Sequence, residues 1–322
     1  MKKLIVLLLT IAMVGAVSAQ VTTAVSLSGE VVLVDEAGNS VLKDKGAGYD
    51  TLTFKASDKD SKYGFSLTYA DINVLNVDPR DGTFWVDPRD WNFWWKGQYA
   101  KVILGNLRNG DFRTTLPYWA GATIFGGTDR ITAYGVLIEN AAPISGLTFG
   151  VNLPIGIAAS KTLDVLQKAD VGLKYKMEGI GTATVLLNAD FVTPSTVLNA
   201  GFTYTGIKDL TGVAIFQGKF NANTYKAALG LAYSGIDKLA LNLEGAYTTT
   251  AGASAFSVWG QGAYNLTDKV SATVGGSVAN GGAYDAYANL GYDFGNGLSS
   301  EVGGGYNGAL YAAAKIYYSV SF

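Results

Sequence analysis

The main pattern of the chain is an alternation of large apolar residues with small or polar ones. It is regular in residues 63–69 and 147–153, and it returns in residues 239–247 and 284–294. A period of two sends successive side chains to opposite faces of a β-strand. These segments therefore predict strands with one apolar and one polar face. A soluble β-sandwich alternates in the same way, so the pattern predicts an all-β fold and leaves the surroundings of the apolar face open.

The length of the predicted strands favours a membrane. The clear ones run for roughly 9 to 13 residues, whereas strands of globular proteins are mostly about five or six residues long. A tilted strand needs about 9–11 residues to cross a bilayer. We therefore predict a transmembrane antiparallel up-and-down β-barrel. Such a sheet must close, because each unpaired backbone group at an edge in hydrocarbon costs several kcal/mol.

Five tyrosines recur just before the expected short turns. They are Tyr175, Tyr204, Tyr233, Tyr264 and Tyr292. Their spacings of 29, 29, 31 and 28 residues correspond to one hairpin each, so they would lie at the same end of alternate strands. Aromatic side chains in that arrangement form a ring at a membrane interface. A general enrichment of tyrosine in β structure explains the near-constant spacing less well.

The two ends of the chain resemble export signals. Lys2 and Lys3 precede an almost unbroken apolar run over residues 4–14, and small residues follow up to Ala19. We expect a cleaved signal peptide over residues 1–19, because the apolar run is shorter than the roughly 20 residues of a spanning helix. At the other end, apolar residues occupy every second position from Leu310 to Phe322. This segment resembles the C-terminal signal that the barrel-assembly machinery reads, with Phe322 as its terminal residue.

The composition excludes several classes of function. The chain has no cysteine and no histidine, so it lacks disulfides, the usual general base and the commonest zinc ligand. Charged residues make up 16% of the chain, against about 25% in typical soluble domains. The net charge is −2, and without Lys2 and Lys3 it becomes about −4, whereas nucleic-acid binding favours concentrated basic charge. We expect no enzyme activity, no cofactor, no metal site and no nucleic-acid partner.

We predict one barrel domain over residues 20–322 with eighteen strands. Bacterial single-chain barrels have an even number of strands, which places both termini on the periplasmic side. The number depends on a hairpin within residues 92–105 that turns at Gly97–Gln98; without that hairpin the number is sixteen. The long connections, which we place outside the cell, are 35–48, 73–91, 106–129 and 154–168.

The polar face of the strands predicts a water-filled lumen. A barrel of 16 to 18 strands is too wide for inward side chains to fill, and the residues opposite the apolar face are small, polar or charged. The charged ones that we expect to line the pore are Lys174, Asp190, Lys226, Glu244, Asp285, Glu301 and Lys315. Charges of both signs suit water, so the sequence predicts an aqueous channel.

With these features the chain resembles the general porins of bacterial outer membranes. The resemblance covers the signal peptide, the amphipathic strands, the short turns and the terminal Phe322, and residues 97–105 resemble the strand that leads into the third extracellular loop. In that family the loop folds into the barrel and narrows it. The resemblance implies a pore constriction in residues 106–129 and passive diffusion of small hydrophilic solutes. It also implies a homotrimer in outer-membrane lipid. The constriction residues that it assigns are Arg108, Asp111 and Arg113.

Two alternatives to a general channel stay open. Five of the six tryptophans, which could stack sugars as in a sugar-selective channel, are Trp85, Trp91, Trp94, Trp95 and Trp119. An interface ring or a contact between subunits explains them equally simply. The other alternative is an adhesin or structural surface barrel, which would carry long loops around its whole mouth.

Overall fold

The computed structural model describes residues 19–34, 40–44, 51–70, 88–119, 125–140, 145–154, 156–157, 163–164, 167–192 and 195–321. The expected signal peptide, except for Ala19, and the terminal Phe322 lie outside these residues. Trp85 also lies outside them.

The first part of the chain forms strands β1 to β8. Their bounds are β1 (Ala19–Val34), β2 (Ser40–Asp44), β3 (Thr51–Asp58), β4 (Tyr63–Ala70), β5 (Pro88–Lys96), β6 (Ala100–Asn109), β7 (Ile131–Asn140) and β8 (Leu147–Pro154). Two short strands follow in a separate small sheet, β9 (Gly156–Ile157) and β10 (Leu163–Asp164).

The second part forms strands that are all long enough for a tilted membrane strand, which needs about 9–11 residues. Their bounds are β11 (Lys168–Met177), β12 (Gly181–Asp190), β13 (Ser195–Ile207), β14 (Leu210–Lys219), β15 (Thr224–Ile236), β16 (Leu239–Thr250), β17 (Ala253–Asn265), β18 (Val270–Ala279), β19 (Tyr284–Gly295), β20 (Leu298–Tyr306) and β21 (Leu310–Ser321). Two short 3₁₀ turns interrupt them, η2 (Phe220–Ala222) and η3 (Asn280–Gly282). Within the described residues, no helix is long and apolar enough to cross a membrane.

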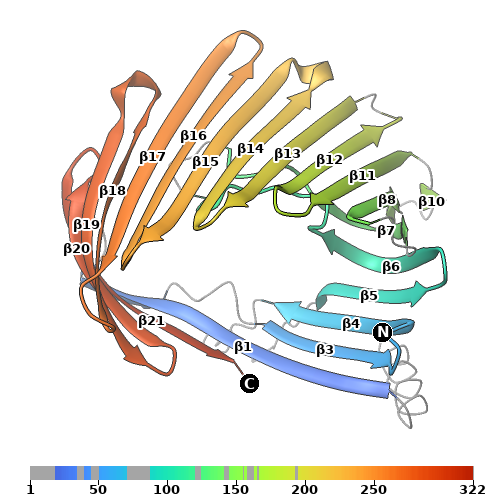
Figure 1. Ribbon diagram of the computed structural model, residues 1–322, viewed down its shortest axis with the longest axis horizontal. Helices are drawn as coiled ribbons and strands as arrows, with labels where there is room; N and C mark the ends of the chain where they lie inside the picture. The colour runs from blue at the N-terminus through green and yellow to red at the C-terminus, as the bar shows by residue number, and fades with distance from the viewer. Residues whose placement is uncertain are drawn as a thin grey trace, which may run out of the picture.

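Neighbouring strands pair antiparallel in chain order, so the predicted all-β, up-and-down architecture is confirmed. Strand β8 pairs with β11, which continues the same sheet past the small β9–β10 pair. Strand β1 pairs with β3 along residues 19–26 and with β21 along residues 26–34. The first and last strands are thus hydrogen-bonded neighbours, and Figure 1 shows the strands following one another in a ring.

The two faces of the wall differ as the alternation predicted. In β15, Leu229 is 66% exposed, whereas its neighbours Ala228 and Gly230 are buried. The same side of β15 and of other strands carries further exposed large apolar side chains, which suits contact with lipid rather than water. These include Leu231, Leu241, Leu243, Val258, Val274, Leu290 and Val302.

The turns confirm two sequence expectations. Strands β5 and β6 form the hairpin at Gly97, with pairs from Lys96–Lys101 to Asn92–Gly105. The number of strands stays a prediction, because residues 35–39, 45–50 and 71–87 lie outside the described part of the chain.

All five ring tyrosines lie opposite the first residue of a neighbouring strand, as in the pairs Leu210–Tyr233 and Leu239–Tyr264, and therefore at one end of the wall.

Candidate functional site

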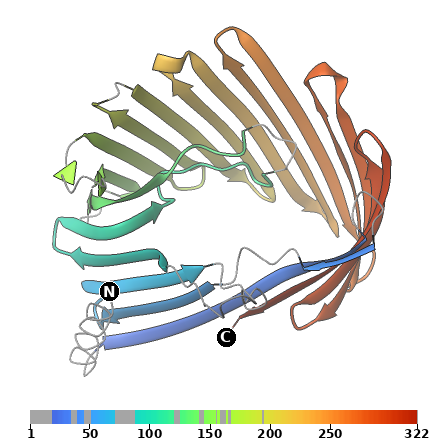
Figure 2. The same ribbon diagram turned by 180° about the vertical axis from the view of Figure 1, so that it is seen from behind.

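The loop after β6 lies inside the ring of strands. Figure 2 shows this teal segment against the inner side of the wall. The loop is shorter than the predicted 106–129, because β6 continues to Asn109 and β7 begins at Ile131. Its two arms pair with each other: the Leu116 N–H donates to the Gly126 carbonyl at 3.1 Å, and the Thr128 N–H donates to the Thr114 carbonyl at 2.9 Å.

A row of glycines on the inner face of the wall makes room for the loop. Gly150 in β8 and Gly172 in β11 are directly paired across the strands, and both would place a Cβ atom against the ring of Phe112. A Cβ on Gly201 would meet Thr114, and a Cβ on Gly230 would lie 2.5 Å from Cδ of Pro117. Because atoms cannot approach so closely, any side chain at these positions would displace the loop.

Apolar side chains of the loop pack against the inner face of the wall. Phe112 is 1% exposed and packs in one buried cluster with Leu107, Ile131, Leu137 and Leu186. Leu116 and Phe125 belong to a second cluster with Val213, Ile215, Ala228 and Ala246 of the wall. Full burial of such a side chain contributes about 1.5–3 kcal/mol, so the described residues of the loop are held against the wall at several points rather than at one.

Glu244 of β16 holds the tip of the loop. Its carboxylate is 1% exposed, and Oε1 accepts hydrogen bonds from the backbone N–H groups of Tyr118 and Trp119, both at 2.7 Å. The Tyr118 ring stacks on Trp259 of β17 with centroids 4.5 Å apart. Trp119 has a φ of 55°, which is uncommon for a bulky residue. The wall thus fixes the chain direction at the tip.

Arg113 is oriented by the loop itself. Its Nε–H donates to the Thr128 carbonyl at 2.8 Å, and its Cζ lies 5.0 Å from the centre of the Trp119 ring. Burial and the nearby Arg130 guanidinium lower the pKa of Arg113 below its ordinary value, while Asp129 acts in the opposite direction. Arginine keeps its charge at neutral pH with a large margin, so this side chain is a fixed cation.

The other two residues assigned to the constriction are associated with the wall. Asp111 accepts an ion pair from Lys174 of β11, with Nζ 3.7 Å from Oδ1, so it is joined to the wall. Arg108 belongs to β6, opposite Thr132 of β7, rather than to the loop.

The remaining residues expected to line the pore lie on several strands of the wall. Asp190 pairs with Lys168 at 3.1 Å, and the Nζ of Lys226 lies 5.3 Å from the ring centre of the loop residue Phe125. Glu301 accepts a hydrogen bond from Asn289 and lies opposite Lys315 across β20 and β21. Asp285 lies opposite Ser277 of β18, which lies opposite Trp259, the residue that stacks on Tyr118 of the loop.

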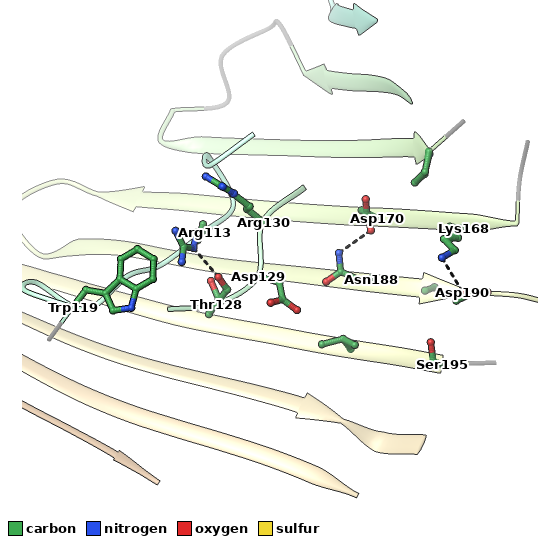
Figure 3. Close-up of a pocket in the computed structure, with 13 residues that line it drawn as sticks. Arg113, Trp119, Thr128, Asp129, Arg130, Lys168, Asp170, Asn188, Asp190 and Ser195 are labelled. Carbon is green, nitrogen blue, oxygen red and sulfur yellow. Dashed lines mark hydrogen bonds and ion pairs between the residues drawn. The ribbon is translucent and has the colours of Figure 1, made fainter. Parts of the chain in front are cut away.

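A cavity of about 640 Å³ separates the loop from strands β8 and β11–β13. Figure 3 shows Arg113 and Arg130 side by side, with Asp170 on a wall strand beyond them. Asp190, Asn188 and Ser195 also line it. Its size falls within the range of small-molecule sites, and its lining is mixed in charge.

A row of amides, which the sequence analysis missed, borders this cavity. Asp170 accepts hydrogen bonds from Asn152 at 2.8 Å and from Asn188 at 2.7 Å. Asn199 donates to Asn188 at 3.0 Å, and Gln217 donates to Asn199 at 2.8 Å. Five neighbouring strands thus present one connected polar row. The available signal was the position of each residue on the polar face of its strand.

The tryptophans do not share one surface among the described residues. Trp91 and Trp95 occupy alternate positions of β5 and therefore one face, and Trp95 is 56% exposed. Trp94 lies on the opposite face, where its ring is 5.8 Å from Nζ of Lys55, and Trp119 lies on the loop. A continuous row for stacking sugars is therefore not formed by these four side chains.

The ring of amphipathic strands with a loop packed inside it defines an outer-membrane, porin-type β-barrel fold. Solved structures of this class are similar at low identity. The outer membrane protein OpdK of Pseudomonas aeruginosa has a TM-score of 0.56 at 10% identity, covering 94% of this chain and 99% of that one. OccK11 (OpdR) of the same species has a TM-score of 0.55 at 9% identity, with 94% and 96% covered.

A mutant of the Rh. blastica porin is also similar, with a TM-score of 0.52 at 12% identity and 94% and 100% covered. No family model and no curated protein matches the chain. At these identities the similarity establishes the fold, and it agrees with the porin resemblance of the sequence.

Proposed function

We propose that this protein forms a water-filled channel in the bacterial outer membrane, through which small hydrophilic solutes and ions diffuse passively. The observation that carries the proposal is the loop packed on the inner wall, because it narrows a barrel that side chains alone would leave open. The exposed apolar outer face fits lipid, and the charged inner face fits water.

Charged groups at the narrowed level would bias the traffic of ions. Arg113 is the best placed of the three constriction residues, because it lines the cavity beside the loop. Asp111 acts there with its partner Lys174, and Arg108 keeps only the role that the porin resemblance gives it. Lining residues of both signs elsewhere on the wall would keep the lumen hydrated. These are Asp190, Lys226, Asp285, Glu301 and Lys315, whereas Glu244 is buried beneath the loop.

Export and assembly complete the proposal. A signal peptide over residues 1–19 would direct the chain across the inner membrane, and Phe322 would present the barrel to the assembly machinery. We expect a homotrimer in outer-membrane lipid and no enzyme activity. The sugar-selective channel and the surface adhesin remain the alternative functions.

The test is single-channel conductance of the refolded protein in a planar bilayer with a salt gradient. Stable open steps of nanosiemens order are the expected result, and the reversal potential gives the sign of ion selectivity. A gel shift on heating provides the control for folding. Folded, heat-modifiable protein that never conducts would overturn the channel and favour the adhesin or structural barrel.

A further inference from the structure

The loop side of the cavity has a net positive charge, because Arg113 and Arg130 line it together with one carboxylate, that of Asp129. The Arg113 guanidinium offers five N–H donors, and the Thr128 carbonyl occupies the one on Nε. Arg113 forms no ion pair with any carboxylate of the described chain. Its Nη groups can therefore bind an anionic group in the cavity, and Arg130 strengthens the positive potential there.

The wall provides an anionic side. Asp170 is 9% exposed and lines the same cavity, and its two carboxylate oxygens each accept one amide N–H, from Asn152 and Asn188. Within the described part of the chain, no basic side chain pairs with it. The amides on both sides of Asp170 donate towards this carboxylate, and hydrogen bonds in such a row reinforce one another.

Short contacts join the two sides. Thr128, whose carbonyl holds Arg113, is followed by Asp129, and the Asp129 N–H donates to Oδ1 of Asn199 at 3.1 Å. Asn199 belongs to the amide row that ends at Asp170. The loop and the wall are therefore fixed to each other at this point, and both charges stand in a preformed arrangement.

We propose that this cavity binds a zwitterionic solute of the amino-acid class during its passage, with the carboxylate at Arg113 and the ammonium at Asp170. The inference deepens the channel function proposed above and rests on it. A simple anion would meet the repulsion of Asp170 and its neighbours, and a simple cation would meet that of Arg113 and Arg130. A solute with both charges gains from each side, which also fixes its orientation.

The experiment measures channel block by L-alanine. Single channels in potassium chloride are titrated with L-alanine, with lactamide as an uncharged solute of similar size and with lactate as the anion. We expect conductance to fall saturably with alanine and much less with the other two. Arg113→Gln and Asp170→Asn should each weaken the block by about tenfold, since each removes one charge-assisted contact.

The variants are expected to fold. In Asp170→Asn the new amide can donate to Oδ1 of Asn152, which has no hydrogen-bond partner in the wild-type structure, after that amide flips. Asp237→Asn removes one negative charge in an exposed turn. We expect L-alanine to block this control variant as strongly as it blocks the wild type.

Three results would overturn the proposal. Equal block by lactate and alanine, with Asp170→Asn unchanged, would mean a simple anion site. Conducting channels that no solute blocks would remove the binding site and leave the channel function intact. Folded protein without any conductance would remove the channel function as well.

Discussion

Removing the carboxylate of Glu244 should release the tip of the loop. Tyr118 and Trp119 each donate a backbone hydrogen bond to it at 2.7 Å, and hydrogen bonds to charged groups contribute about 1.5–3 kcal/mol each. Both donor residues are partly exposed, so water can replace the lost partner and the lower value applies. Glu244→Ala should then weaken the docked tip by about 3 kcal/mol, which raises the undocked population by about 100-fold.

The assay is open-channel conductance and its noise in planar bilayers. We expect Glu244→Ala to conduct more than the wild type and to fluctuate more, because a released tip no longer narrows the lumen. Glu244→Gln should lie between the two, since an amide oxygen accepts the same bonds with about half the strength. Glu178→Ala, in an exposed turn, removes a carboxylate elsewhere and controls for net charge. If folded Glu244→Ala protein had wild-type conductance and noise, Glu244 would not be what holds the tip of the loop.

Three other substitutions test the wall. Gly172→Val should displace the start of the loop and lower the free energy of unfolding by about 1–3 kcal/mol through overpacking, which urea unfolding and conductance would measure. Gly245→Val is the matched control, since the nearest atom to a Cβ at that position lies 3.8 Å away. Leu243→Arg should destabilise the protein in vesicles by about 2–4 kcal/mol and Asn242→Arg by much less; equal losses would contradict the assigned faces. Asp58→Ala should lower the midpoint of unfolding, because Asp58 accepts backbone N–H bonds from the following turn. An unchanged midpoint would exclude that role.

The sequence predicted the wall well because the signals for it are local. A strand of period two reveals its apolar face within seven residues, as 147–153 does, and the tyrosine spacing revealed the repeat of hairpins. The turn at Gly97 could be located because two alternating segments meet there. Each of these features depends on residues that are neighbours in the chain, so the register of distant strands was not needed.

The contacts that hold the loop against the wall could not be predicted in the same way. Glu244 lies 126 residues from Tyr118, and nothing in the local sequence of either residue indicates the other. The inward glycines, such as Gly172, look like ordinary strand glycines until their neighbours in space are known. Asp111 has the charge of a constriction residue, yet the register places Lys174 beside it. Contacts between a loop and a wall require the pairing of all the strands between them.

The row of glycines also has a consequence for how stability is distributed in this protein. Glycine in a strand is less stable than alanine by roughly 0.5–1 kcal/mol, so four of them weaken the wall by about 2–4 kcal/mol where the loop lies. The packed side chains of the loop offset this deficit. The stability of the wall therefore depends on the loop. Deleting the loop to widen the channel would leave a barrel that is less stable than one whose strands evolved without a loop packed inside them.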